Sequence, residues 1–215
     1  MKQRLEVNTS NIYHRPVYHG LKRLLDVILS TAFLLLFWWL YVIIAIAIKI
    51  DDPHSPIFYL QTRVGQNGRC FRIYKFRSMV PDADREKPAL LKYNDMDSVM
   101  FKMHDDPRVT KVGHFIRRHS LDELPQLVNV LEGDMTLVGP RPPLLNEVKH
   151  YNDYDCQRLL VTPGCTGLWQ VSGRNGLTFH QTVNLDLEYI NHSNLWFDTE
   201  IILKTLEVMV VPNGV

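Results

Sequence analysis

Two neighbouring carboxylates mark the stretch around which this chain is organised, SLDELPQ at residues 120–126. Ser120 and Glu123 have the spacing of a capping box, in which each side chain bonds the other residue's backbone N–H at a helix start. Pro125 suits a first helical turn because it has no N–H that would need a partner. The stretch therefore predicts that Asp122 and Glu123 lie in or just before the first turn of a helix.

The predicted helix continues with apolar residues at helical spacing and stops at Gly133. The free N–H groups and the positive dipole end at a helix start stabilise an anion and attract phosphate. Acids are also common there simply because they favour the helix. This stretch alone therefore leaves two interpretations open, a functional site and a helix cap.

Composition narrows the classes of function. A chain of 215 residues suits one catalytic or binding domain with an attachment segment. The 24 basic and 23 acidic residues nearly balance, so no nucleic-acid partner is expected. Cys70, Cys156 and Cys165 are odd in number and have no metal-ligand spacing, which is typical of reduced cytosolic thiols.

An uncharged apolar run extends from Val27 to Ile48. Its 22 residues would form a helix of about 33 Å, enough for a hydrocarbon core of about 30 Å. We therefore predict three regions: a basic, loosely ordered lead-in at 1–23, a membrane-inserted helix at 24–50, and a cytoplasmic domain at 51–215.

Both flanks of the apolar run are basic. Five Lys or Arg residues lie between Lys2 and Arg23, and six lie between Lys49 and Arg77. Because basic flanks stay in the cytoplasm, a helix that enters the bilayer and returns on the same side would satisfy both. The alternative is a single span with a weak charge bias.

The segment after the run predicts a β-hairpin, with strands at 57–60 and 71–77 around a turn at 65–68. Its basic and aromatic residues suit the headgroup layer of a membrane. Lys75 and Arg77 could also hold a diphosphate.

Four further cationic or acidic residues are candidates for a site. An amphipathic helix is predicted from Val109 to a basic end at Arg117, only five residues before Asp122. Prolines on both sides of Arg141 stiffen its backbone. Asp186 and Asp198 lie in a last helical segment at about 182–211.

Taken together, the motifs resemble the monotopic phosphoglycosyl transferases, also called the bacterial sugar transferase family. The resemblance covers residues 21–210 approximately, and five motifs in family order carry it. They are KFRSM at 75–79, SLDELPQ at 120–126, GDM at 133–135, LVGPRP at 137–142, and the loop that runs from Pro163-Gly164 to Gly173-Arg174.

The resemblance implies a mixed, mostly α fold. It implies an N-terminal re-entrant membrane helix and a small α/β cytoplasmic domain with a β-hairpin and amphipathic interfacial helices. The implied location is the bacterial inner membrane, with the catalytic domain facing the cytoplasm. The implied reaction moves a phosphosugar from a UDP-sugar to undecaprenyl phosphate and releases UMP. Such a step initiates exopolysaccharide, capsule or other surface glycan synthesis.

The resemblance also implies residue roles. Asp122 would be the nucleophile, and Glu123 would help bind Mg²⁺ (or Mn²⁺) or handle a proton, so both are expected metal ligands. The expected substrate-binding residues are Lys75, Arg77, Arg117, Arg141, Asp186 and Asp198.

One departure concerns the membrane helix. Family members usually carry Ser-Pro where this chain has Trp38-Trp39, and no proline lies between Gly20 and Pro53. A bend would then need another cause, such as Ser30 or Thr31 bonding to the backbone. The sugar is expected to be galactose or glucose, because Pro142-Pro143 and the sequence LWQ at 168–170 are typical of hexose-type members.

Two rival functions remain open at this point: a membrane-anchored nucleotide-sugar hydrolase that uses the same acids, and a non-catalytic membrane scaffold in which Asp122 and Glu123 only cap a helix. A homo-oligomer is also compatible with the sequence.

Overall fold

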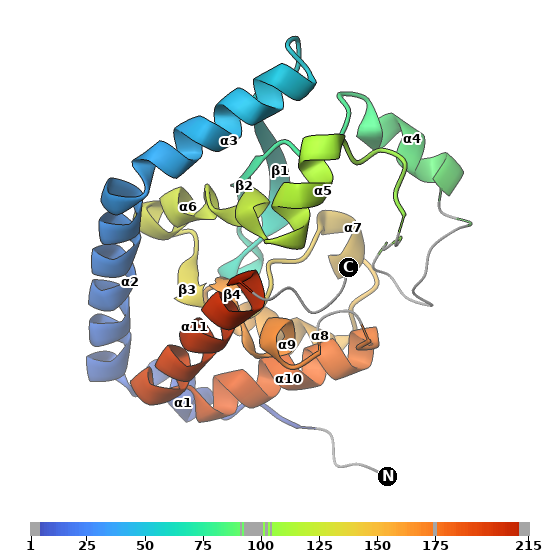
Figure 1. Ribbon diagram of the computed structural model, residues 1–215. Helices are drawn as coiled ribbons and strands as arrows, with labels where there is room; N and C mark the ends of the chain where they lie inside the picture. The colour runs from blue at the N-terminus through green and yellow to red at the C-terminus, as the bar shows by residue number, and fades with distance from the viewer. Residues whose placement is uncertain are drawn as a thin grey trace.

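A bent pair of helices follows one side of the molecule (Figure 1). Helix α2 (Pro16–Leu36) and helix α3 (Trp38–Asp51) meet at Phe37 with an angle of 62°. Among the described residues no single helix is long and apolar enough to cross a membrane. The two helices of this bent pair together have the length and apolar composition that a crossing would need. The structure is a computed structural model that describes residues 5–90, 92, 101, 103, 105–173 and 176–210.

The bend falls within one residue of the predicted position, and it forms without a proline. Phe37 leaves the helical conformation (φ −110°, ψ 19°), while its N–H still bonds to the Phe33 carbonyl. The rings of these two residues lie 4.6 Å apart, and Trp39 packs against Phe37 from the other side of the break. Ser30 does not cause the bend, because its buried hydroxyl makes no hydrogen bond. Tilted aromatic rings in contact with one another therefore line the break.

The expectation of a loosely ordered lead-in is wrong for residues 9–23. Helix α1 (Thr9–Tyr13) and the first turns of α2 occupy this region, and α2 starts at Pro16, eight residues before the predicted boundary at 24. Long-range contacts order it: Arg15 donates to the Ser193 carbonyl at 2.6 Å, and Arg23 donates to the Leu131 carbonyl at 2.9 Å.

The predicted β-hairpin is confirmed. Strands β1 (Phe58–Val64) and β2 (Cys70–Phe76) pair antiparallel, and the turn between them uses positive φ angles at Asn67 and Gly68. At the open end, Phe76 is buried against α3 and α5 in a cluster that includes Ile44, Ile48 and Ile116. The hairpin thus packs directly on the second half of the bent pair.

Two short strands from the middle and later parts of the chain pair in parallel. Strands β3 (Thr136–Val138) and β4 (Gly164–Thr166) approach so closely that a Cβ at Gly164 would lie 2.1 Å from the Gly139 nitrogen. Only glycine permits this contact, which places the proline-rich segment around Arg141 beside β4.

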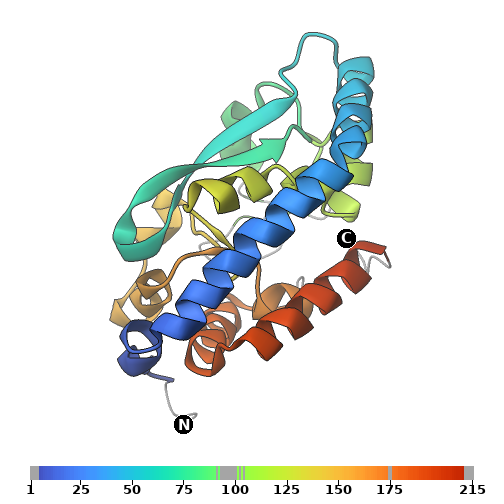
Figure 2. The same cartoon turned by 90° about the vertical axis from the view of Figure 1, so that its left-hand side faces the viewer.

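The C-terminal segment forms two helices where one was predicted. Helix α10 (Phe179–His192) ends before Ser193, and α11 (Leu195–Val210) starts after Asn194, whose side chain accepts the Phe197 N–H. Figure 2 shows α11 beside α2, with the hairpin on the opposite side of α2. The other helices are α4 (Ala83–Leu90), α5 (Lys111–Arg118), α6 (Gln126–Glu132), α7 (Leu145–Val148), α8 (Asp153–Cys156) and α9 (Leu168–Val171).

The architecture agrees with the coarse prediction of a mostly helical fold, since about 60% of the described residues are helical and the sheets are small. Three positions of the sequence argument, Lys2, Arg4 and Arg174, lie outside the described residues.

Gly113 provides a test of how α5 is packed. A Cβ at this position would lie 2.0 Å from the Ser78 carbonyl oxygen, so Gly113→Ala should destabilise the fold by about 1–3 kcal/mol, the usual range for overpacking. Gly20→Ala is the matched control, because nothing lies within 4 Å of the added methyl group and alanine favours a helix. Thermal unfolding followed by circular dichroism should show a lower midpoint for Gly113→Ala alone. Equal midpoints would contradict the close approach.

Candidate active site

Asp122 and Glu123 lie on a 3₁₀ turn, Leu121–Glu123, between α5 and α6; we call it the Asp-Glu turn. The predicted capping box does not form. Ser120 adopts a left-handed conformation (φ 55°), its N–H bonds to the Arg117 carbonyl, and its side chain caps no helix N–H. The Glu123 side chain pairs with Lys75 instead. Helix α6 starts only at Gln126.

The predicted end of this helix is confirmed at Gly133, which has a φ of 90° and whose N–H bonds back to the Asn129 carbonyl. Helix α6 therefore occupies the place predicted from the sequence, and the two acids lie just before its first turn, one of the two placements predicted.

Asp122 is a buried carboxylate surrounded by charged groups. Its side chain is almost enclosed, and burial raises its pKa to about 6. Lys75 and Arg117 oppose that rise in pKa, and the charge of Glu123 adds to it. The structure thus brings together four of the predicted site residues, from β2, α5 and the Asp-Glu turn.

Glu123 pairs with Lys75, whose Nζ lies 2.6 Å from Oε1. The Glu123 side chain remains 37% exposed, so this ion pair lies at the surface end of the site. Lys75 reaches it because α6 holds the strand in place: the Asn129 side chain accepts the Tyr74 N–H and donates to the Arg72 carbonyl.

Arg141 is held by a carboxylate as well as by its flanking prolines. Its guanidinium lies 3.1 Å from Glu147 on α7. Beside it, Arg63 on β1 is buried and donates to the Pro142 carbonyl at 3.0 Å. Burial and the charge of Arg141 lower the pKa of Arg63 to about 10, whereas Glu147 and Glu123 act in the opposite direction. Arg63 therefore connects the Arg141 segment to the Asp-Glu turn electrostatically.

Arg63 and Glu147 were not predicted as site residues. Glu147 had one usable signal in the sequence, its position three residues after Leu144, which is the spacing of a capping acid. In the structure it accepts the Leu144 N–H at the start of α7. Arg63 had none in a single sequence, since a strand arginine is usually solvated.

Asp186 forms a fully buried ion pair with Arg158, which the sequence argument also missed. Burial raises the pKa of Asp186 to about 6, and Arg158 opposes that rise. Arg158 also donates to the Tyr151 hydroxyl at 3.0 Å and to the Arg141 carbonyl at 3.4 Å. Asp186 is thus linked to the Arg141 segment through the guanidinium of Arg158.

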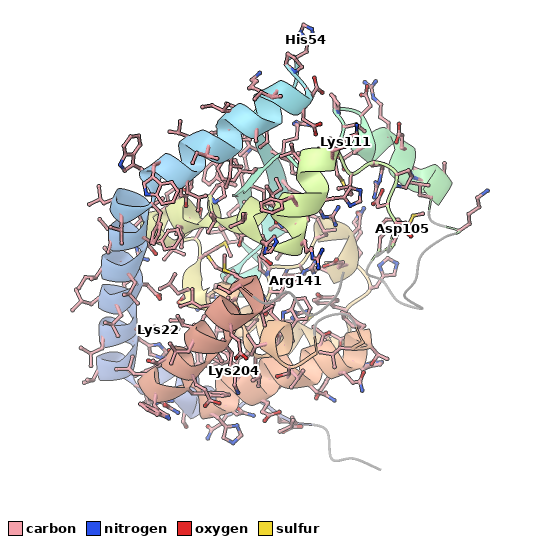
Figure 3. The ribbon with its side chains drawn as sticks, viewed as in Figure 1. Lys22, His54, Asp105, Lys111, Arg141 and Lys204 are labelled. Atoms are coloured by element: carbon pink, nitrogen blue, oxygen red, sulfur yellow. The ribbon has the colours of Figure 1, made fainter. Side chains whose placement is uncertain are left out.

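Arg77 and Asp198 make contacts elsewhere. Arg77 donates to the Pro56 carbonyl and lies over the Tyr59 ring. Asp198 accepts hydrogen bonds from Lys22 at 3.0 Å and from the Tyr189 hydroxyl at 2.6 Å. Figure 3 shows Lys22 on α2, well apart from Arg141. A direct role of Arg77 and Asp198 in substrate binding stays a prediction.

The two adjacent acids fit a metal that arrives with its substrate. Among the described residues, no group of three or more His, Cys, Asp or Glu side chains is placed to hold an ion. Asp122 and Glu123 nevertheless offer hard carboxylate oxygens on one turn, and Mg²⁺ is commonly bound by one or two carboxylates together with substrate phosphates and water.

Comparison with known proteins gives the family. The model of the bacterial sugar transferase family matches residues 17–212. A galactosyl transferase of Streptococcus agalactiae is 53% identical over 77% of this chain and 37% of its own length. The undecaprenyl-phosphate galactose phosphotransferase of Salmonella typhimurium is 42% identical over 90% of this chain and 41% of its own length.

A third relative has a length close to that of this chain. The exopolysaccharide production protein ExoY of Rhizobium meliloti is 37% identical over 93% of this chain and 90% of its own length. The chain therefore spans about two fifths of two relatives and nearly the whole of another. With nearly its whole length matched by the family model, the chain belongs to the bacterial sugar transferase family.

Proposed function

We propose that this protein transfers a phosphosugar from a UDP-sugar to polyprenyl (undecaprenyl) phosphate and releases UMP, through a covalent intermediate on Asp122. The observation that carries the proposal is the buried Asp122 carboxylate with Lys75, Arg117 and Glu123 around it. A carboxylate in such surroundings is equipped to attack phosphorus while nearby cations offset the charge of the phosphoryl group.

In the first step an Asp122 carboxylate oxygen attacks the sugar-bearing phosphorus of the UDP-sugar. The bond from that phosphorus to the bridging oxygen breaks, and UMP leaves with the electron pair. Lys75 and Arg117 lie close enough to Asp122 to affect its charge, so they stabilise the negative charge that develops during the transfer.

In the second step an oxygen of polyprenyl phosphate attacks the phosphorus held on Asp122. The acyl phosphate bond breaks, which restores the carboxylate and yields polyprenyl diphosphosugar. Arg141, held by Glu147 and by the backbone contacts of Arg63 and Arg158, presents a fixed guanidinium for a phosphate or diphosphate group.

Asp122 and Glu123 are the residues that would hold a divalent cation, Mg²⁺ or Mn²⁺, together with the substrate diphosphate. Such a cation neutralises phosphate charge and favours departure of UMP. Because Glu123 also bonds to Lys75, that pair would keep Glu123 facing the diphosphate.

The sugar we propose is galactose, with glucose as the second choice. A galactosyl transferase, a galactose phosphotransferase and a UDP-galactose-lipid carrier transferase are all among the relatives. A relative from Escherichia coli is named for UDP-glucose. Relatives named for exopolysaccharide production support a role in initiating exopolysaccharide, capsule or another surface glycan.

The setting we propose is the cytoplasmic face of the bacterial inner membrane, where UDP-sugars and the lipid acceptor meet. The outer side of the bent pair exposes large apolar residues, including Leu35, Trp38 and Ile43. The chain before the pair is tied to the domain, since the Val7 N–H bonds to Gln157 and the Asn8 N–H to Asn191. Contacts of this kind would keep both ends of the pair on the same side of a membrane, which supports re-entry.

The covalent step predicts a burst without acceptor. Protein mixed with labelled UDP-galactose alone should release about one equivalent of UMP and retain labelled phosphosugar. Asp122→Asn should abolish both, whereas Glu132→Gln, a matched change at the C-terminal end of α6, should preserve both. Analysis of UMP and of protein-bound label by chromatography measures the outcome.

Three results would contradict this prediction. Release of UMP only when polyprenyl phosphate is present would indicate a ternary mechanism. Continuous release of free sugar phosphate without acceptor would identify a hydrolase. An active Asp122→Asn variant would leave the two acids with no more than a capping role.

The metal proposal predicts that a chelator removes activity. After treatment with EDTA, UMP release should fall to background and return when Mg²⁺ or Mn²⁺ is added, because the two carboxylates favour hard cations. Full activity after exhaustive treatment would refute the requirement.

Re-entry predicts that residue 6 and the hairpin share one side of the membrane. In a variant without the native cysteines, Glu6→Cys is a suitable probe, because Glu6 is exposed and contacts Asn191 only through its carbonyl oxygen. The matched variant keeps Cys70, which is exposed on the hairpin. Both should resist an impermeant maleimide in intact cells and react after permeabilisation. Rapid reaction of Glu6→Cys alone in intact cells would show a spanning segment.

A further inference from the structure

Tyr41 connects the bent helix pair directly to the Asp-Glu turn. It lies in the first turn of α3, four residues after the break at Phe37, and its hydroxyl donates to the Leu124 carbonyl at 2.9 Å. Leu124 stands two residues after Asp122. We propose that Tyr41 is a positioning residue for the phosphoryl transfer of the proposed function, on which this inference rests.

The bond falls on the junction where the Asp-Glu turn becomes α6. The Leu124 N–H closes the turn onto the Leu121 carbonyl, and the Leu124 carbonyl accepts the Leu127 N–H at 3.1 Å. Pro125 follows and has no N–H to donate. The Tyr41 hydroxyl is therefore a second donor to the peptide group that sets the direction of the turn relative to the helix.

The ring of Tyr41 contacts the other element of the site. It packs against Phe76 with centroids 5.5 Å apart, and Phe76 immediately follows Lys75 on β2. One side chain thus touches both the strand that supplies Lys75 and the peptide next to the two acids. Its position constrains how Lys75 faces Asp122 and Glu123.

The Asp-Glu turn has a specific need for external support. Ser120, directly before it, adopts a left-handed conformation that is unfavourable for residues other than glycine. Such a conformation persists only when the surroundings determine it. Tyr41 helps to hold the turn in place from the bent helix pair, through its hydrogen bond to Leu124. The angle at Phe37 is therefore linked to the positions of Asp122 and Glu123.

The test removes one hydroxyl and keeps the ring. Tyr41→Phe leaves the packing on Phe76 intact, and Tyr74→Phe is the matched control, because the Tyr74 hydroxyl contacts exposed Glu132 at the far end of α6. Both variants and the unmodified full-length protein are placed in lipid nanodiscs. The rate and amplitude of the UMP burst, the KM for UDP-galactose and the thermal midpoint are then measured.

Tyr41→Phe should lower the burst rate by roughly 10-fold to 100-fold, the effect expected when a reacting group is displaced by about 1 Å. The burst amplitude, the KM and the thermal midpoint should match those of the unmodified protein, because substrate binding and folding do not need the hydroxyl. Tyr74→Phe should have no effect on the burst rate.

Other results would overturn the inference. An unchanged burst rate in Tyr41→Phe would show that the hydroxyl does not position the acids. A lower amplitude with an unchanged rate, together with a lower midpoint, would show a purely structural contact. Absence of any UMP burst from the unmodified protein would refute the covalent step of the proposed function, and the role of Tyr41 in that step would fall with it.

Discussion

The side chain of Asn129 makes the contact on which the rest of the site depends. Fully buried in α6, it bonds to the main chain of β2 on both sides, at the Arg72 carbonyl and the Tyr74 N–H. The main-chain carbonyl of Asn129 accepts the N–H groups of the residues that follow α6, beginning with Gly133. Leaving such buried groups without partners is unfavourable, so the strand and the helix hold one register. That register determines that Lys75 meets Glu123.

The carboxylates of the site differ in the charges that surround them. Arg158 with Asp186, and Arg141 with Glu147, are cation–carboxylate pairs in which at least one partner is buried. Asp122 is buried as well, but its nearest charges pull its pKa in opposite directions. The paired groups form a rigid frame, because breaking a buried pair is strongly unfavourable. Asp122 is the acid within that frame to which the proposed function assigns the covalent step.

The bent helix pair packs into the domain and also exposes large apolar side chains. Lys22 of α2 bonds to Asp198 of α11, and Asp26 accepts hydrogen bonds from β3. These contacts give Asp198 a place in the structure that its sequence position did not suggest. These contacts also fix α2 against α11 and β3. The bend at Phe37 therefore decides where α3 and its side chains lie.

The sequence by itself determined the family, the hairpin and the end of α6 at Gly133, because motif order, local spacing and turn residues encode them. Its charged flanks and family resemblance favoured a bend near Trp38 but left a straight span open. It also singled out Asp122, Glu123 and Lys75 through motifs, and Arg117 through its short sequence distance from Asp122, as candidate site residues that the structure brings together. Only the tertiary structure decided that Ser120 does not cap a helix, that Arg63 and Arg158 join the site, and that Asp198 contacts α2. The physical reason is that these outcomes depend on contacts between residues far apart in the chain, whose burial and pairing no local pattern records.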